Sequence, residues 1–326
     1  MKKIILNSLL LLLFAFSACV QSATAITSVP EKASQTVSIN PNEIPENEAE
    51  VIKKFRFKNK FQRSPEAQIK SFYKNFSKYS EHNEVEKLKA LYSDLFINND
   101  GFDKNIIFKM MTDSADAYKD ITNTLDIEKI SVDGNYAVVD LHEFAIGSTS
   151  KINNNTGDYG LISSDMYYTD YLQKEGSKWK ITSTNVKSER VMLKYGEAKN
   201  MAVEIVAPRL VPAGSEYNVD VNLSSPDGVM LIGSIVNEQI LYPQVQKKDV
   251  FRAIKSESLS RVLKSNADAH NEYATATIGI TRVSVDPPKV SVGMTGMAFI
   301  MTRINVVNVK KNNMKVAENE SKTSVK

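Results

Sequence analysis

The chain has 326 residues, more than one ordinary hydrophobic core requires, which predicts two domains with accessory segments. Apolar residues make up 42% of it and charged residues 24%, values typical of a globular protein. The formal net charge is only +3, and the basic residues form no basic domain or stripe, so nucleic acid is excluded as an expected partner.

The first 18 residues have the pattern of an export signal. Lys2 and Lys3 give a positive start, an apolar run extends from Ile4 to Phe16, and two small residues follow. The run is shorter than the roughly 20 residues of a membrane-spanning helix. The only cysteine, Cys19, comes next, and residues 16–19 (Phe-Ser-Ala-Cys) resemble the lipobox of bacterial lipoproteins. The resemblance implies that Cys19 is lipidated and begins the mature protein.

Ordinary signal cleavage after Ala25, which would discard Cys19, is the alternative. A lone structural cysteine would be unusual in an exported protein, whereas a lone lipidated cysteine is expected, so we favour the lipoprotein. The expected location is extracytoplasmic, with the lipid anchor in a bacterial membrane. Val20 after the cysteine implies the outer membrane if the host is diderm, by resemblance to sorting rules. The alternative cleavage predicts a soluble periplasmic or secreted protein.

Residues 19–60 and 311–326 are polar and lack a sustained period. Pro30, Pro41 and Pro45 exclude a long helix in the first of these segments. Neither segment can bury enough apolar surface to offset the entropy lost on ordering, so we expect a disordered tether and a disordered tail.

Residues 61–198 contain three helical patterns and then four strand patterns. Ser64, Asn83 and Asp103 are the expected N-caps of the helices. Apolar residues recur at spacings of three and four at Ile69, Phe72, Tyr73, Phe76 and Tyr79, at Val85, Leu88, Leu91 and Tyr92, and at Ile107, Met110, Met111 and Ala115. Alternating patterns predict strands over 125–132, 136–146, 161–173 and 178–191, with a tight turn at 133–135 and a polar loop over 148–158.

The last two strands form a hairpin, Tyr167–Ile181, that closes with a Gly turn followed by Trp-Lys-Ile. This ending, together with the order of the elements before it, resembles the nuclear-transport-factor-two-like cone of the cystatin-like α+β superfamily. The resemblance implies a bent antiparallel sheet that wraps a long helix and leaves a pocket. Because the superfamily includes enzymes, binding modules and scaffolds, the fold alone implies no activity.

The register of the hairpin predicts which side chains point into the cone. A turn centred on Glu175 and Gly176 pairs Leu172 with Trp179 and Asp170 with Ile181, and directly paired residues share a face. The expected inward residues are Met166, Tyr168, Asp170, Leu172, Trp179, Ile181 and Ser183, and the expected outward ones are Tyr167, Thr169 and Tyr171. We expect the pocket to be lined by Tyr118, Met166, Tyr168, Asp170 and Trp179.

An inward Asp170 beside Tyr168 is a residue pair that proton transfer on a carbonyl substrate would use. Ketosteroid-isomerase-like members of the superfamily use such carboxylates and tyrosines. The alternative is structural: Asp170 binds a helix N-terminus or the Tyr118 hydroxyl, and we favour this interpretation. His142 alternates with apolar residues, which predicts a solvated side chain on the outer face.

The rest of the sequence supplies little chemistry. The three histidines lie in different segments, which predicts no metal site. The sequence has no Gly-rich phosphate loop and no nucleophile elbow, so we expect no cofactor. Asp94, Asp100 and Asp103 surround Gly101, where a turn followed by a helix cap is favoured over a calcium site.

Residues 199–310 contain about seven short strand patterns separated by turns rich in Pro and Gly. This pattern predicts an antiparallel β-sandwich that resembles an immunoglobulin-like domain. The predicted fold class is therefore α+β, with a helix-wrapped, cone-shaped antiparallel sheet followed by an all-β sandwich domain.

The sequence favours a non-enzymatic function: a binding or scaffold module of the cell envelope, with an envelope protein as partner. The alternative is a small-molecule-binding protein or isomerase-like enzyme that holds a small apolar ligand in the cone, with Asp170 and Tyr168 as weak catalytic candidates.

Overall fold

The computed structural model describes residues 64–82, 84–224, 227–244, 250–255, 257–286 and 289–308. The predicted export signal, Cys19, the tether and the tail lie outside the described residues, as does the predicted helix cap Asn83. No helix among the described residues is long and apolar enough to cross a membrane.

The first and last predicted helices are confirmed. Helix α2 (Pro65–Glu81) begins where the Ser64 Oγ accepts a hydrogen bond from the Ala67 N–H at 3.2 Å. Proline stands at the first helical position, where no N–H is needed. Helix α4 (Lys104–Ala117) begins where Asp103 Oδ1 accepts from the Ile106 N–H at 2.9 Å. Each helix buries one apolar face in the same core.

The second predicted helix is wrong in its last turn. Helix α3 covers only Val85–Lys89, and the following residues form a strand, β1 (Tyr92–Asn98). Strand β1 pairs in parallel with a much later strand, with Tyr92 opposite Ile181, and the Ile181 N–H donates to the Leu91 carbonyl at 2.9 Å. The residues spaced by three and four in this segment therefore extend from a short helix into the start of a strand. That strand forms because it pairs with residues far along the chain.

Four long antiparallel strands follow in sequence, namely β2 (Tyr118–Asp133), β3 (Tyr136–Ile152), β4 (Tyr159–Glu175) and β5 (Lys178–Gly196). Gly134 and Gly176 have φ of 57° and 64° in the tight turns, a conformation that glycine adopts without steric cost. The predicted loop over 148–158 is too long, because β3 continues to Ile152, which pairs with Tyr159. Thr149 stabilises this extension, since its Oγ1 accepts from the Gly160 N–H at 2.8 Å.

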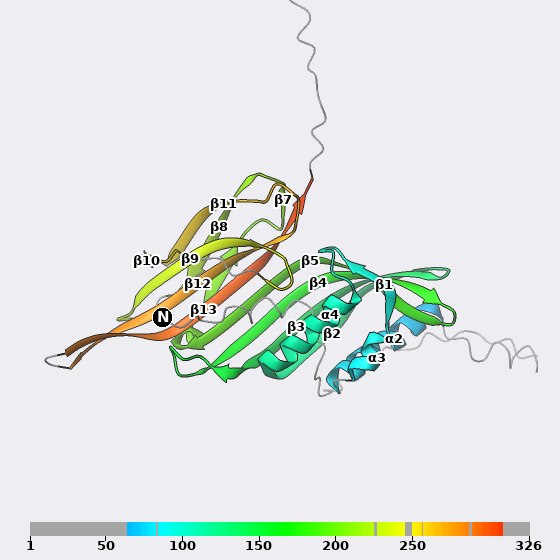
Figure 1. Ribbon diagram of the computed structural model, residues 1–326, viewed down its shortest axis with the longest axis horizontal. Helices are drawn as coiled ribbons and strands as arrows, with labels where there is room; N and C mark the ends of the chain where they lie inside the picture. Colours follow the sequence, from blue (N-terminus) through cyan, green and yellow to red (C-terminus); the bar gives the residue numbers. More distant parts are fainter. Residues whose placement is uncertain are drawn as a thin grey trace, which may run out of the picture.

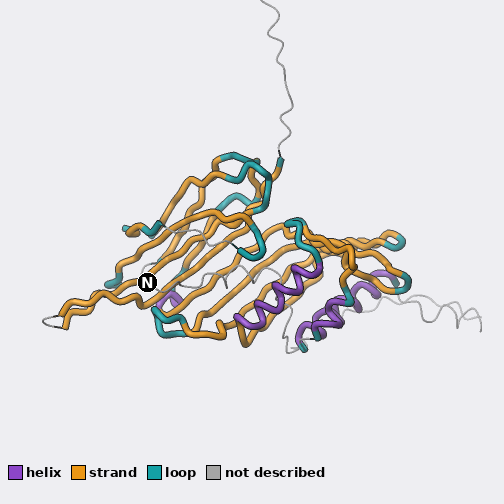
Figure 2. Tube along the Cα trace, in the orientation of Figure 1, coloured by secondary structure: helices purple, strands orange, loops and turns teal. Residues whose placement is uncertain are grey.

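A short 3₁₀ helix, η3 (Glu197–Asn200), leads into the remaining strands. These are β6 (Val203–Val206), β7 (Leu210–Pro212), β8 (Glu216–Leu223), β9 (Met230–Gln239), β10 (Arg252–Ile254), β11 (Ser258–Lys264), β12 (Glu272–Asp286) and β13 (Lys289–Val307). One large, curled sheet has the order β10-β9-β12-β13-β5-β4-β3-β2, and a second sheet has the order β11-β8-β6. Figure 1 shows the helices over the β2–β5 end of the large sheet and the second sheet at the other end, and Figure 2 shows that strand is the main secondary structure.

The large sheet joins the two predicted domains. Residues 296–302 of β13 pair with residues 190–196 of β5, so the C-terminal strands extend the sheet of the cone. The inner face and helices α2 and α4 enclose one core. A second core lies between the three-stranded sheet and β9, β12 and β13. An independent all-β sandwich is not confirmed, because β9, β12 and β13 belong to the sheet of the cone.

A buried ion pair also crosses the predicted domain boundary. Arg303 on β13 donates two hydrogen bonds to Asp100, at 2.5 and 3.0 Å, and both side chains are almost completely buried. Asn271 donates to the same carboxylate at 2.8 Å, and Asn305 accepts from the Arg303 Nε at 2.9 Å. The predicted turn around Gly101 is therefore correct, and Asp100 has a structural partner that the local sequence does not indicate.

We predict that Arg303→Met destabilises the protein by about 3–5 kcal/mol, because Asp100 would stay buried without its cation. Urea denaturation measures the free energy of unfolding. The double variant Asp100→Asn/Arg303→Met should recover part of this loss. As a control, Arg282→Met breaks the surface pair between Arg282 and Glu197 and should cost less than about 1 kcal/mol. Equal losses in the two single variants would contradict a special role for the buried pair.

Candidate functional site in the cone

The observed register of the β4–β5 hairpin differs from the predicted one by two residues, so the side chains keep their faces but have other partners. Glu175 pairs with Lys178, so Leu172 lies opposite Ile181 and not opposite Trp179. The strand β5 then has a bulge at Thr182, which shifts its phase, and Asp170 consequently lies opposite Thr184. Ser183, which was predicted to point inward, donates to the Ile97 carbonyl at 2.7 Å.

Along β4 the predicted alternation is largely correct. Met166, Tyr168, Asp170 and Leu172 are buried on the inner face, and Tyr167 and Tyr171 are exposed on the outer face. Thr169 is the exception, because it is buried on the outer side, where its hydroxyl donates to Asp140 at 2.6 Å.

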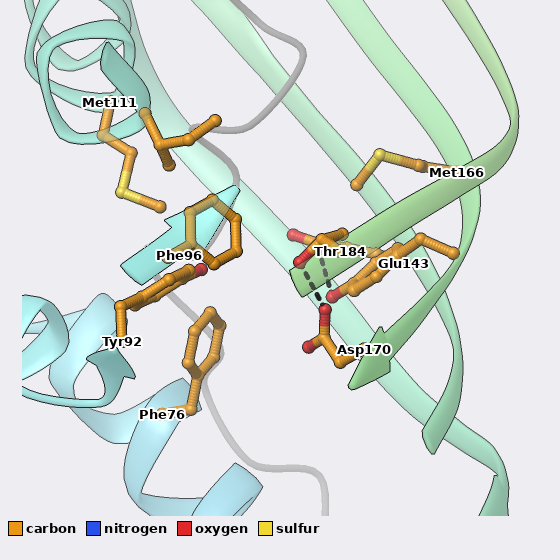
Figure 3. A pocket seen from close by; sticks show the side chains of 10 residues that line it. Phe76, Tyr92, Phe96, Met111, Glu143, Met166, Asp170 and Thr184 are labelled. Carbon is orange, nitrogen blue, oxygen red and sulfur yellow. Dashed lines mark hydrogen bonds between the residues drawn. The ribbon is translucent and has the colours of Figure 1, made fainter. Parts of the chain in front are cut away.

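The inner face bounds a cavity of about 30 Å³. Its lining is Phe76, Tyr92, Phe96, Ile107, Met111, Glu143, Met166, Tyr168, Asp170 and Thr184. Figure 3 shows aromatic rings and Met111 on the helix side of the cavity, facing the polar groups of the sheet. The volume is close to that of one water molecule and about a tenth or less of a typical small-molecule pocket.

Of the five predicted lining residues, the structure brings three together: Met166, Tyr168 and Asp170. Tyr118 and Trp179 are buried in the same core but do not line the cavity. Trp179 is held elsewhere, since its Nε1 donates to Gln68 Oε1 at 3.3 Å. The register of the hairpin is one reason, because Trp179 pairs with Lys174 near the turn, whereas Asp170 lies opposite Thr184.

Asp170 is fully paired by hydroxyl groups. Tyr73 of α2 donates to its Oδ2 at 2.8 Å, and Thr184 of β5 donates to its Oδ1 at 2.6 Å. Burial raises the pKa of Asp170 to about 6, and the two hydrogen bonds oppose this rise. The structural interpretation of Asp170 therefore predicted the right kind of partner, a tyrosine hydroxyl, but the donor is Tyr73 and not Tyr118.

A second carboxyl group, Glu143 on β3, shares the cavity and was not predicted. Asn123 donates to its Oε1 at 3.0 Å and Tyr168 donates to its Oε2 at 3.2 Å. Burial raises the pKa of Glu143 to about 8, so this carboxyl is mostly neutral at pH 7. The strand alternation contained the signal, because Glu143 lies between the inward residues Leu141 and Ala145.

The neighbouring His142 lies on the opposite, outer face, as predicted. Its ring stacks on Tyr167 with centroids 4.1 Å apart and an interplanar angle of 6°. Its Nε2 is hydrogen-bonded to Asp165 Oδ1 at 2.7 Å. His142 therefore has no access to the cavity and cannot act as a base there.

Within the described ranges, no group of three or more His, Cys, Asp or Glu side chains is arranged to hold a metal ion. The chemistry of the cavity thus depends on two carboxyl groups and the tyrosine hydroxyls that bind them. Burial raises the pKa values of Tyr73 and Tyr168 well above their usual range, so both phenols stay protonated and act as hydrogen-bond donors.

Comparison with known proteins gives similarity of fold over part of the chain. No protein-family model matches the sequence, and no curated protein matches it. A protein described as a scytalone dehydratase from Novosphingobium aromaticivorans is 16% identical with a TM-score of 0.31, over 37% of this chain and 81% of that one. A conserved protein from Planctomyces limnophilus is 11% identical with a TM-score of 0.33, over 38% and 95%.

A type 2 hexachlorocyclohexane dehydrochlorinase (LinA) is 12% identical with a TM-score of 0.31, over 37% of this chain and 82% of that one. The scytalone dehydratase and LinA belong to the nuclear-transport-factor-two-like superfamily. The likeness covers about 37% of the chain and does not assign an activity to it.

The raised pKa of Glu143 predicts how stability depends on pH. An acid whose pKa is higher in the folded state stabilises the fold fully below its unfolded value of 4.5, and this contribution is lost as the pH rises through about 8. Gln mimics the neutral acid and does not titrate. The free energy of unfolding of Glu143→Gln should therefore rise relative to wild type between about pH 5 and 8, by up to about 1.4 kcal/mol per pH unit.

Urea denaturation at a series of pH values measures this difference. The exposed Glu128 on β2 supplies the control, and Glu128→Gln should follow the wild-type curve. Parallel curves for wild type and Glu143→Gln would contradict the assignment of a neutral buried acid.

Proposed function

We propose that this chain is an exported, lipid-anchored protein of the bacterial cell envelope whose folded body acts as a non-catalytic binding or scaffold module. Lipidation of Cys19 would tie the body to the membrane, the outer membrane if the host is diderm. Cleavage after Ala25 would instead make it a soluble periplasmic or secreted protein. The observation that carries the proposal is the cavity of about 30 Å³, because the interior of the cone is packed as a core.

The state of the buried polar groups supports the same proposal. Each carboxyl group in the cavity already has two donors, with Tyr73 and Thr184 on Asp170 and Asn123 and Tyr168 on Glu143. Buried polar groups that are satisfied in this way hold neighbouring elements in register. Here they connect helix α2 to the sheet and link β2, β3, β4 and β5.

The C-terminal strands have a place in this proposal. We assign the three-stranded sheet and the strands that it covers to the immunoglobulin-like sandwich expected from the sequence, and residues 64–198 to the nuclear-transport-factor-two-like cone. Because β5 and β13 are paired, the two parts would present partners as one rigid body.

A second candidate function is a small-molecule-binding protein or isomerase-like enzyme that uses Asp170 and Tyr168. The observation that favours it is the pair of carboxyl groups on one cavity with pKa values of about 6 and about 8, which suit a base and an acid. Helix α2 or α4 would have to move away from the sheet to admit a ligand, since the present cavity accepts little more than water.

Asp170→Asn separates the two candidates. If Asp170 is structural, the variant should lose about 1–3 kcal/mol of unfolding free energy, because one of its two hydroxyl donors loses its acceptor. Chemical denaturation measures this loss, with Asp165→Asn on the outer face as the matched control. Unchanged stability, together with lost turnover or lost binding of a small apolar ligand, would favour the enzyme.

The lipid anchor has a separate test. Radiolabelled fatty acid should enter the wild-type protein in cells, and Cys19→Ser should abolish the label because the chain has no other cysteine. Fractionation should then find the variant released from the membrane. Equal labelling of the two proteins would refute lipidation at Cys19.

A further inference from the structure

The outward side of helix α2 carries a row of lysines. Lys70, Lys74 and Lys78 are exposed and spaced by four residues, so they lie along one side of the helix, away from the side that packs in the core. The two acids of this helix, Glu66 and Glu81, lie at the two ends of the row. Because the net charge of the whole chain is only +3, the row is a local excess of positive charge.

The turn between β4 and β5 adds two lysines near the start of the same helix. Lys178 is exposed, and the Lys174 Nζ lies 5.1 Å from the centre of the Trp179 ring. The Trp179 Nε1 donates to Gln68 in the first turn of α2, so the turn and the helix meet at one end of the cone (Figure 1). We call the resulting surface the basic face and define it by five residues: Lys70, Lys74, Lys78, Lys174 and Lys178.

The sequence that leads into α2 also has an excess of positive charge. Residues 51–63 contain six basic side chains, no acidic ones and three phenylalanines. Four glutamates precede them over residues 43–50, farther from the helix along the chain. The chain from Cys19 therefore joins the folded body beside the basic face. A flexible chain of the length of residues 20–63 would span about 35 Å, so a lipid on Cys19 alone would leave the orientation of the body open.

We propose that the basic face is the surface by which the folded body lies on an anionic phospholipid bilayer. The inference rests on the proposed location at a membrane and names the side of the body that faces it. Each cation close to an anionic bilayer strengthens binding by about fivefold. A lipid chain and a basic patch together anchor a protein more stably than either one alone.

The composition of the basic face favours a bilayer over a protein partner. No large apolar side chain of α2 is exposed, whereas the centre of a protein interface is usually apolar and depleted in lysine. A bilayer requires no such centre, because its phosphate groups form a wide negative surface that attracts a row of lysines without specific pairing.

Co-sedimentation with vesicles tests the proposal. The mature chain, residues 19–326, is used with Cys19→Ser, so that it carries no lipid and only its own surface can bind. It should bind vesicles made of equal parts phosphatidylglycerol and phosphatidylcholine, and bind vesicles of phosphatidylcholine alone at least about tenfold more weakly. It should leave the anionic vesicles at 1 M salt, where the Debye length falls to about 3 Å.

Removing the row should weaken this binding. Lys70→Gln/Lys74→Gln/Lys78→Gln should lower the affinity for the anionic vesicles by at least about tenfold, because three cations are lost. Thermal unfolding should change little, since all three side chains are exposed. Trp179, the only tryptophan, reports contact at the same end of the cone. A lipid with a spin label on its headgroup should quench the fluorescence of Trp179 in the bound protein.

The matched control is Lys151→Gln/Lys255→Gln/Lys264→Gln, which removes three exposed lysines from other parts of the body. It should bind nearly as the unsubstituted chain does, because charges more than a Debye length from the bilayer are screened.

Three results would each overturn the proposal. The first is a chain that does not bind the anionic vesicles, as expected if its partner is an acidic protein. The second is an equal loss of affinity in the two triple variants. The third is unquenched Trp179 in the bound protein, since another surface would then contact the lipid. Fatty-acid labelling alone decides lipidation at Cys19, and the vesicle measurement uses a chain without lipid, so a failure of either leaves the other result intact.

Discussion

Strand β5 organises the molecule because both of its edges are used. One edge pairs with β4 along nearly its whole length. The other edge is divided, with parallel β1 opposite residues 181–184 and antiparallel β13 opposite residues 190–196. The chain turns away from β5 between these two segments, at residues 99–103, and there Asp100 binds Arg303. The pair therefore fixes the point where the two strands divide this edge.

This division explains why the helices and the C-terminal strands depend on each other. Strand β1 precedes α4 directly, so the position of α4 over the sheet follows from the residues of β5 that β1 can reach. Strand β13 occupies the rest of the edge, and its Met297, Phe299 and Met301 belong to the same core as the helices. Residues on both sides of the predicted boundary at 198 thus form one hydrophobic core.

Burying acids in that core has a cost that hydrogen bonds offset only in part. Glu189 on β5 illustrates it. Burial raises its pKa to about 8 although Arg303 and the Tyr273 hydroxyl oppose the shift. Tyr273 donates to its Oε2 at 3.0 Å, while its Oε1 has no hydrogen-bond partner among the described residues. With Glu143 and Asp170, the inner face of the sheet holds three acids whose pKa values are raised, and one arginine, paired with Asp100, cannot neutralise them.

Local pattern was sufficient to predict some parts of this structure from the sequence. The face of α2, the cap at Asp103, the glycine turn at Gly134 and the inward side of β4 follow from spacing and turn chemistry within a few residues. The inward position of Glu143 could also have been predicted, because Glu143 follows the same alternation along β3 as its neighbours. The interpretation missed it because charged residues are usually solvated.

Other features depend on partners far along the chain. Residues 92–98 are a strand because β5 pairs with them about 90 residues later, and no local preference indicates that pairing. Asp100 and Arg303 are 203 residues apart, so neither residue identifies the other. The bulge at Thr182 has no sequence signal either, although it places Thr184, and not Ser183, opposite Asp170.

These facts bear on where this fold can interact with other molecules. The cavity between the aromatic rings and the paired acids Asp170 and Glu143 has a volume of about 30 Å³, which leaves little free space for a ligand. The outer face of the same strands differs in kind. It carries apolar side chains that the fold leaves in water at a free-energy cost, since each buried methylene group would gain about 0.8 kcal/mol. The three-stranded sheet removes part of this cost at the other end of the face, because it covers β9, β12 and β13 there and buries their side chains in the second core.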